Sequence, residues 1–220
     1  MLRSVSEEPI TRRPLKTRSA SWAKQLSRIF LKFGFTPDGI SSTGILFAAT
    51  GGAAILYAPL SQHAWVFWLL GAAGIQFRLL CNMLDGMLAV EGGLKSPLGE
   101  LFNELPDRLE DALILVPLGY AGGTPLTVAL GWAAACGAIA TAYLRAMGAG
   151  LTGSHDFCGP MAKPHRMAAV TFLCFVMICM DLADLVFPVL KWGLAAILVG
   201  IAITCVRRIH RLAITLKQPS

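Results

Sequence analysis

Two pairs of polar residues, one at each end of a connecting segment, have the residue types and spacing of a cation site. Asn82 and Asp85 share one face of a predicted helix, and Asn103 and Asp107, four residues apart, share a face of the next. If the two helices pack antiparallel, Asp85 and Asp107 come together. Oxygen ligands from Asp and Asn suit Mg²⁺ or Mn²⁺, which proteins usually bind together with substrate phosphates. The pattern therefore predicts a divalent-cation site that serves a phosphate-containing ligand.

The composition indicates the environment of these residues. Of the 220 residues, 55% are hydrophobic and only 15% are charged, whereas a soluble domain usually carries about 25% charged residues. The sequence therefore predicts an all-α integral membrane protein. The net charge of +6 is gathered at segment ends, as membrane topology requires, so we expect no nucleic-acid partner. The six cysteines form no CxxC pair and most lie in apolar segments, so we expect neither disulfides nor a zinc site.

Six apolar segments must position the polar residues, and each is close to the roughly twenty residues that cross a bilayer. They lie at about residues 39–58, 64–88, 108–124, 127–148, 167–185 and 188–206. Lys and Arg are concentrated before the first segment, in alternate connections and in the tail, with Lys191 as the exception. The positive-inside rule then predicts a multi-pass protein with both termini in the cytoplasm, located in the cell inner membrane if the source is bacterial.

The regions outside the six spans are polar or amphipathic. We expect residues 1–20 to form a disordered basic cytoplasmic arm and residues 21–36 an interfacial amphipathic helix, although a soluble amphipathic helix would show the same pattern. Residues 37–208 would form the membrane domain, and residues 209–220 a cytoplasmic tail. Small residues in the fourth span allow close helix packing, either within the chain or at the seam of a homodimer.

Buried carboxylates in such a protein need an explanation. One at a membrane helix centre costs roughly 2.5–3.5 kcal/mol on insertion scales, and two that converge repel each other unless a cation lies between them. The alternative is that these residues are solvated helix ends, with Arg108 paired to Glu104 or Asp111. Spacing alone leaves both interpretations open.

The segment resembles the CDP-alcohol phosphotransferase family, whose motif runs D-x2-D-G-x2-A-R-x8-G-x3-D-x3-D. The corresponding residues here are Asn82, Asp85, Gly86, Ala89, Val90, Gly99, Asn103 and Asp107. Thr36-Pro37-Asp38 followed by Ser41 is similar to the family's entry to its first span. Polar residues also stand where the family places groups near the nucleotide or phosphates: Ser96, Tyr143, Arg145 and Lys163. Six spans preceded by an interfacial helix are that family's architecture.

The resemblance implies a function for each matched position. Asp107 would be metal ligand and general base, and Asp85, Asn82 and Asn103 would be metal ligands. The other matched positions would bind substrate: Gly86, Ala89, Ser96, Gly99, Asp38, Ser41, Arg145 and Lys163. The implied reaction is transfer of a phosphatidyl or phospho-alcohol group from a CDP-linked donor, such as CDP-diacylglycerol, to an alcohol acceptor. CMP leaves, and the reaction belongs to phospholipid biosynthesis.

Three departures from the motif reduce its charge. The first and third aspartates are Asn82 and Asn103, and the arginine is Val90. Amide oxygen is a neutral, weaker ligand for a hard cation, so a two-metal site could become a one-metal site. Asp111 could restore negative charge, and Arg78 could replace the arginine. Two rival hypotheses remain: a catalytically impaired relative that binds lipid or nucleotide as a membrane scaffold, and a small transporter. The clustering of charge at one face opposes the transporter.

Overall fold

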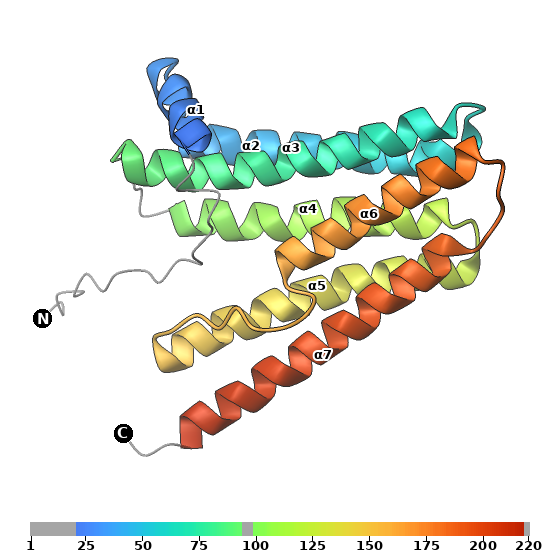
Figure 1. Ribbon diagram of the computed structural model, residues 1–220. Coiled ribbons are helices and arrows are strands. Elements are labelled where there is room, and N and C mark those ends of the chain that lie inside the picture. The colour runs from blue at the N-terminus through green and yellow to red at the C-terminus, as the bar shows by residue number, and fades with distance from the viewer. Residues whose placement is uncertain (1–20, 94–98, 218–220) are drawn as a thin grey trace, which may run out of the picture.

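The computed structural model describes residues 21–93 and 99–217. These residues form seven α-helices and one short 3₁₀ helix (Figure 1). The elements are α1 (Ser21–Lys32), α2 (Pro37–Tyr57), η2 (Ala58–Leu60), α3 (Ala64–Glu91), α4 (Gly99–Ala121), α5 (Pro125–Thr152), α6 (Lys163–Leu182) and α7 (Val189–Lys217). The arm predicted for residues 1–20, and Ser96, lie outside the described residues.

Five helical segments in the described part of the chain are long and apolar enough to cross a membrane. They are α2 with η2, α3, α5, α6 and α7. This confirms the all-helical, multi-pass character that the composition predicts. Helix α4 does not meet the same measure, because its N-terminal half is rich in charged residues.

Two helices extend by more than two turns beyond the apolar segments seen in the sequence. Helix α4 begins at Gly99, where the apolar run begins near residue 108, and α7 continues past residue 206 to Lys217. The physical reason is that a helix satisfies its own backbone groups and does not need apolar side chains to continue. In α4 the added turns carry Glu104 and Asp107, which pair with residues of α5 and α6.

The helices alternate in direction, so their ends form two groups. Figure 1 shows α1, the C-terminal end of α3, the N-terminal end of α4 and the C-terminal end of α7 toward one end of the molecule. The turns between α2 and α3, α4 and α5, and α6 and α7 lie at the other. The residues of the predicted site in α3 and α4 therefore belong to the end that also holds the C-terminal end of α7.

Helix α2 packs along both α3 and α4, while α3 and α4 approach each other much less closely. The antiparallel neighbours assumed from the sequence are therefore joined mainly by long side chains that reach between them. Close approach occurs instead between glycines: a Cβ on Gly74 of α3 would lie 2.7 Å from Cα of Gly51 in α2. Likewise a Cβ on Gly131 of α5 would lie 2.7 Å from Cα of Gly119 in α4. The small residues around Gly131 thus serve packing within the chain.

Candidate functional site

Asp85 is a buried carboxylate at the centre of the site. It lies in α3 with 2% of its surface exposed. Its Oδ2 accepts a 2.7 Å hydrogen bond from Oγ of Ser41, and its Oδ1 accepts one from the backbone N–H of Gly86. Ser41 is positioned by the start of α2, where the Thr36 side chain caps the backbone N–H of Gly39. The described residues form no ion pair with Asp85, so its charge is stabilised only by neutral donors and by charges further away.

Asp107 and Lys163 lie close to this carboxylate. Lys163 is the first residue of α6, and its ammonium group forms an ion pair with Oδ1 of Asp107 in α4. The charges of Asp107 and Lys163 both act on Asp85. The structure thus brings Asp85, Asp107 and Lys163 from three helices into one electrostatic neighbourhood. Within the described residues, no hydrogen bond joins Asp85 directly to Asp107.

A second set of charges is buried directly beside the first. Arg78 of α3 donates from Nε to Glu110 at 2.6 Å and from Nη2 to Asp111 at 2.9 Å. Arg166 of α6 also pairs with Asp111. Asn82 donates from Nδ2 to Glu110 at 3.1 Å. Asp111 and Arg78, which could have compensated for the motif changes, are therefore already bonded to each other.

The pairing expected for solvated helix ends is also present, further out. Glu104 forms ion pairs with Arg108, one turn along α4, and with Arg145 of α5. The Arg145 guanidinium lies 5.6 Å from the ring centroid of Phe157. These side chains are partly exposed, so they join α4 to α5 at the rim, and the buried carboxylates are a separate feature.

The other predicted site residues either lie around these groups or fall outside the part of the chain that the structure describes. Gly86 is buried next to Asp85, and Ala89 follows one turn later and is half-buried. Asp38 is in the first turn of α2, and Gly99 begins α4. The side chain of Asn103 lies outside the described residues, as does Ser96. Val90, at the arginine position of the motif, is 55% exposed.

Only some of the oxygen ligands at this site fit a divalent cation. Within residues 21–93 and 99–217, no three His, Cys, Asp or Glu side chains gather as a ready-made metal cluster. What fits is narrower: in that part of the chain, Asp85 is a buried carboxylate that lacks an ion-pair partner, and Asp107 has the ammonium of Lys163 as its ion-pair partner. Burying an uncompensated carboxylate is costly, so a cation between Asp85 and Asp107 would relieve it.

Sequence reasoning missed two members of the buried set, Glu110 and Arg166. Arg166 has a plain topological explanation as a positive charge at a span end, yet it is only 2% exposed and pairs with Asp111. Glu110 is fully buried. Its position three residues after Asp107 places it on the same polar flank of α4, which is the signal that could have identified it.

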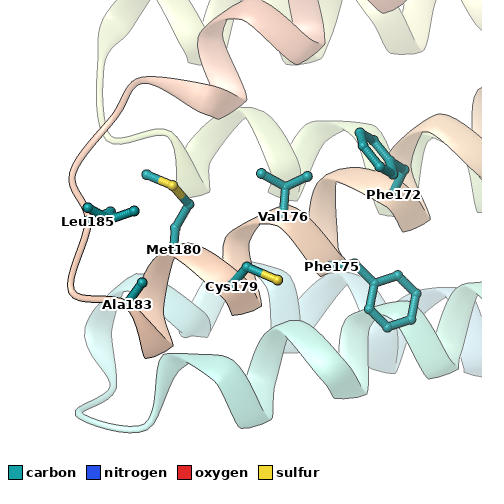
Figure 2. A pocket seen from close by; sticks show the side chains of 7 residues that line it. All are labelled: Phe172, Phe175, Val176, Cys179, Met180, Ala183 and Leu185. Atoms are coloured by element: carbon teal, nitrogen blue, oxygen red, sulfur yellow. The ribbon is translucent and has the colours of Figure 1, made fainter.

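An apolar pocket elsewhere in the described residues is unrelated to this chemistry. Figure 2 shows it at the C-terminal part of α6, lined by apolar side chains that include Phe172, Met180 and Leu185. Because α6 starts at Lys163, this pocket lies toward the other end of the helix. Its lining has no group that could bind a phosphate or a cation.

Comparisons with known proteins give the class of this site. No protein-family model matches the chain. The phosphatidylinositol phosphate synthase of Mycolicibacterium smegmatis is 28% identical in an alignment 208 residues long that covers 89% of this chain and 86% of that protein. These similarities identify the chain as similar to membrane transferases that make phospholipids.

Solved structures agree with the sequence comparison. The crystal structure of the Mycobacterium tuberculosis phosphatidylinositol phosphate synthase with CDP-DAG bound has a TM-score of 0.71 and 25% identity. The match covers 88% of this chain and 94% of that one. The same enzyme in complex with manganese and citrate matches with a TM-score of 0.69 at 24% identity, over 86% of this chain and 88% of that one. The curated relative and the solved structures are phosphatidylinositol phosphate synthases, which are transferases, and this similarity supports the predicted enzyme class.

Proposed function

We propose that this chain transfers a phosphatidyl group from a CDP-linked lipid, such as CDP-diacylglycerol, to an alcohol acceptor and releases CMP. The observation that carries the proposal is the position of Asp85. This carboxylate is buried and has no ion-pair partner in the described residues. It lies beside the Asp107–Lys163 pair, at the end of the molecule where α3 ends and α4 begins. The similarity to an enzyme crystallised with CDP-DAG supports the donor.

Asp107 is the general base of the proposed reaction. Its carboxylate takes the proton of the acceptor hydroxyl, and the oxygen forms a bond to the phosphorus that carries the diacylglycerol. The bond between that phosphorus and the bridging oxygen breaks, and CMP leaves with the electron pair. Lys163 pairs with Asp107 before substrate binds; a bound diphosphate would attract the ammonium and leave the carboxylate free to accept a proton.

Mg²⁺ or Mn²⁺ is the proposed cofactor, held by Asp85 and Asp107 with the amide oxygens of Asn82 and Asn103. When bound, the ion would neutralise phosphate charge during transfer. Ser41 keeps Asp85 oriented for this role through its hydrogen bond. Gly86 and Ala89, small residues next to and one turn after Asp85, would allow the nucleotide to approach the helix, and Arg145 provides a cation at the rim.

The chain is proposed to cross the membrane six times. In this proposal α4, the third span along the chain, is added to the five apolar helices. Its charged N-terminal half is paired with α3, α5 and α6, which removes the obstacle that its composition presents. Helix α1 is proposed to lie at the interface, and both termini in the cytoplasm, because Lys and Arg are concentrated at that end. Residues 37–208 are the proposed membrane domain, and a homodimer in lipid is the proposed assembly.

The test is CMP release by purified protein with CDP-diacylglycerol, a panel of alcohols and Mn²⁺, compared with Asp107→Ala. Wild type should release CMP with at least one alcohol, and EDTA should abolish the release until Mn²⁺ is restored. If no alcohol gives more CMP than Asp107→Ala gives, the proposed activity is wrong. Metal-dependent binding of the donor without turnover would instead identify the chain as a binding protein of the same fold.

A further inference from the structure

Asn82 and Glu110 form a contact between the two helices that carry the site. The Nδ2 group of Asn82 in α3 donates to Oε2 of Glu110 in α4 at 3.1 Å. The same Oε2 accepts from Nε of Arg78 at 2.6 Å. Glu110 is fully buried and Asn82 is partly buried, so water has little access to this contact and its charge is screened less than a surface charge would be.

The contact requires an amide at position 82. A carboxylate can only accept hydrogen bonds when it is ionised, so the NH₂ group of Asn82 must face Glu110, and Oδ1 is left for another partner. An aspartate at position 82 would place a second carboxylate within hydrogen-bond distance of Glu110. Two like charges at such a short distance repel strongly in a buried site.

The surrounding charges are balanced without a further carboxylate. Arg78 and Arg166 provide two positive charges, and Glu110 and Asp111 provide two negative ones. Adding an aspartate at position 82 would leave one negative charge in this set without a counter-ion. Breaking the balance of buried ion pairs is strongly destabilising.

The packing around Glu110 is built to hold a side chain of this size. Oε1 has no hydrogen-bond partner among the described residues, and it lies against Gly44 of α2, where a Cβ would be 2.6 Å from it. A Cβ at position 44 would crowd the carboxylate, so the glycine gives it space at that point. Glu110 is thus fixed between α2 on one side and Arg78 and Asn82 on the other.

We infer that Asn82 and Glu110 are one unit, in which Glu110 is a positioning residue that fixes the Asn82 amide, and that position 82 accepts a carboxylate only if Glu110 is neutralised. Asn82 lies one turn before Gly86 and three residues before Asp85, so the orientation of its amide oxygen bears on whatever Asp85 binds. The inference rests on the proposed phosphotransferase for its effect on activity. The coupling between the two residues does not depend on it.

The consequence is specific and runs against a simple restoration of the motif. Asn82→Asp alone should be harmful, although it recreates the family residue. Glu110→Gln alone should be harmful to a smaller extent, because Arg78 keeps Asp111. In the double variant the donor and acceptor exchange places: the amide at 110 donates to the carboxylate at 82. The charge of the set is then the same as in wild type.

The experiment is a double-mutant cycle on the full chain in one detergent. Wild type, Asn82→Asp, Glu110→Gln and the double variant are compared by thermal unfolding in EDTA and by the Mn²⁺ concentration that gives half-maximal CMP release. Asn82→Asp should lower the melting temperature by several degrees, and the double variant should recover most of that loss. The double variant should also recover the Mn²⁺ response that Asn82→Asp loses, which a purely structural contact would not produce.

The matched control replaces a carboxylate of α4 that does not touch Asn82. Glu104 pairs with Arg108 and Arg145, so Glu104→Gln should add its effect to that of Asn82→Asp with no recovery. Additive losses in the Glu110 cycle, or an Asn82→Asp protein as stable as wild type, would overturn the inference. A cycle that shows recovery in a chain that releases no CMP would support the coupling and reject only the proposed activity.

Discussion

The hydroxyl of Ser41 in α2 donates a 2.7 Å hydrogen bond to Oδ2 of Asp85, which lies 44 positions later in α3. The bond joins the beginning of one membrane helix to the carboxylate in the middle of the site. Ser41 is 3% exposed and Asp85 is 2% exposed, so water cannot replace the bond if it is lost. The entry to α2 and the polar face of α3 are therefore parts of one site.

Removing this hydroxyl should reduce activity without unfolding the chain. Hydrogen bonds to charged groups contribute about 1.5–3 kcal/mol, and about 1.4 kcal/mol corresponds to tenfold in rate. Ser41→Ala should therefore lower CMP release about tenfold or more. The matched control is Ser42→Ala, since the Ser42 hydroxyl donates to the carbonyl of Asp38 in its own helix. Equal losses in the two variants would argue against a role for the Ser41–Asp85 bond.

Much of the fold follows from the sequence, because lipid forces it. Every backbone polar group in a membrane must be satisfied within the helix, so long apolar segments identify the helices directly. The two polar pairs in α3 and α4 were also evident from spacing. Which carboxylate meets which cation was not, because it depends on how α2, α3, α4 and α6 pack. The pairing of Asp111 depends on this packing: Arg78 and Arg166 both bind it, so it is not available to compensate for the changed motif residues.

Lys163 should contribute to binding of the anionic donor. It pairs with Asp107 in the structure and is the first residue of α6, which places a cation beside the proposed base. Lys163→Gln should raise the KM for CDP-diacylglycerol and reduce CMP release by about tenfold, the size of one interaction of about 1.4 kcal/mol.

A control for Lys163 is Lys191, a second lysine near the end of a span. Lys191 lies over the ring of Trp192, 5.0 Å from its centroid, at the opposite end of the molecule. Lys191→Gln removes the same charge, so it should leave the KM unchanged. If Lys163→Gln and Lys191→Gln behave alike, the charge of Lys163 serves topology only.

The contact between α2 and α3 should not accept a methyl group. A Cβ on Gly74 would lie 2.7 Å from Cα of Gly51 and 2.8 Å from the carbonyl oxygen of Phe47, both backbone atoms that cannot move aside. Gly74→Ala should lower the free energy of unfolding by about 1–3 kcal/mol, measured by thermal unfolding in detergent.

The same substitution where space is open provides the control. Gly150 lies in the last turns of α5, and a Cβ there would meet nothing within 4 Å. Gly150→Ala should be neutral or stabilising by up to about 1 kcal/mol, since alanine is the better helix former. A Gly74→Ala protein as stable as Gly150→Ala would show that α2 and α3 can separate at no cost.

At the far end of the molecule, α3 begins under a cap supplied by another helix. Oδ2 of Asp181, in the last turn of α6, accepts a 2.8 Å hydrogen bond from the backbone N–H of Trp65. The first N–H groups of a helix have no partner within it, and His63 at the N-cap provides no side-chain bond. Asp181→Ala should therefore destabilise the chain by about 0.5–2 kcal/mol, whereas Asp181→Asn, which keeps an acceptor oxygen, should cost much less.

Thermal unfolding of the two Asp181 variants, with CMP release measured on the same samples, tests this prediction. Both variants should retain activity at low temperature, because the cap is remote from Asp85. Equal melting temperatures for Asp181→Ala and wild type would mean that the start of α3 is held by other contacts.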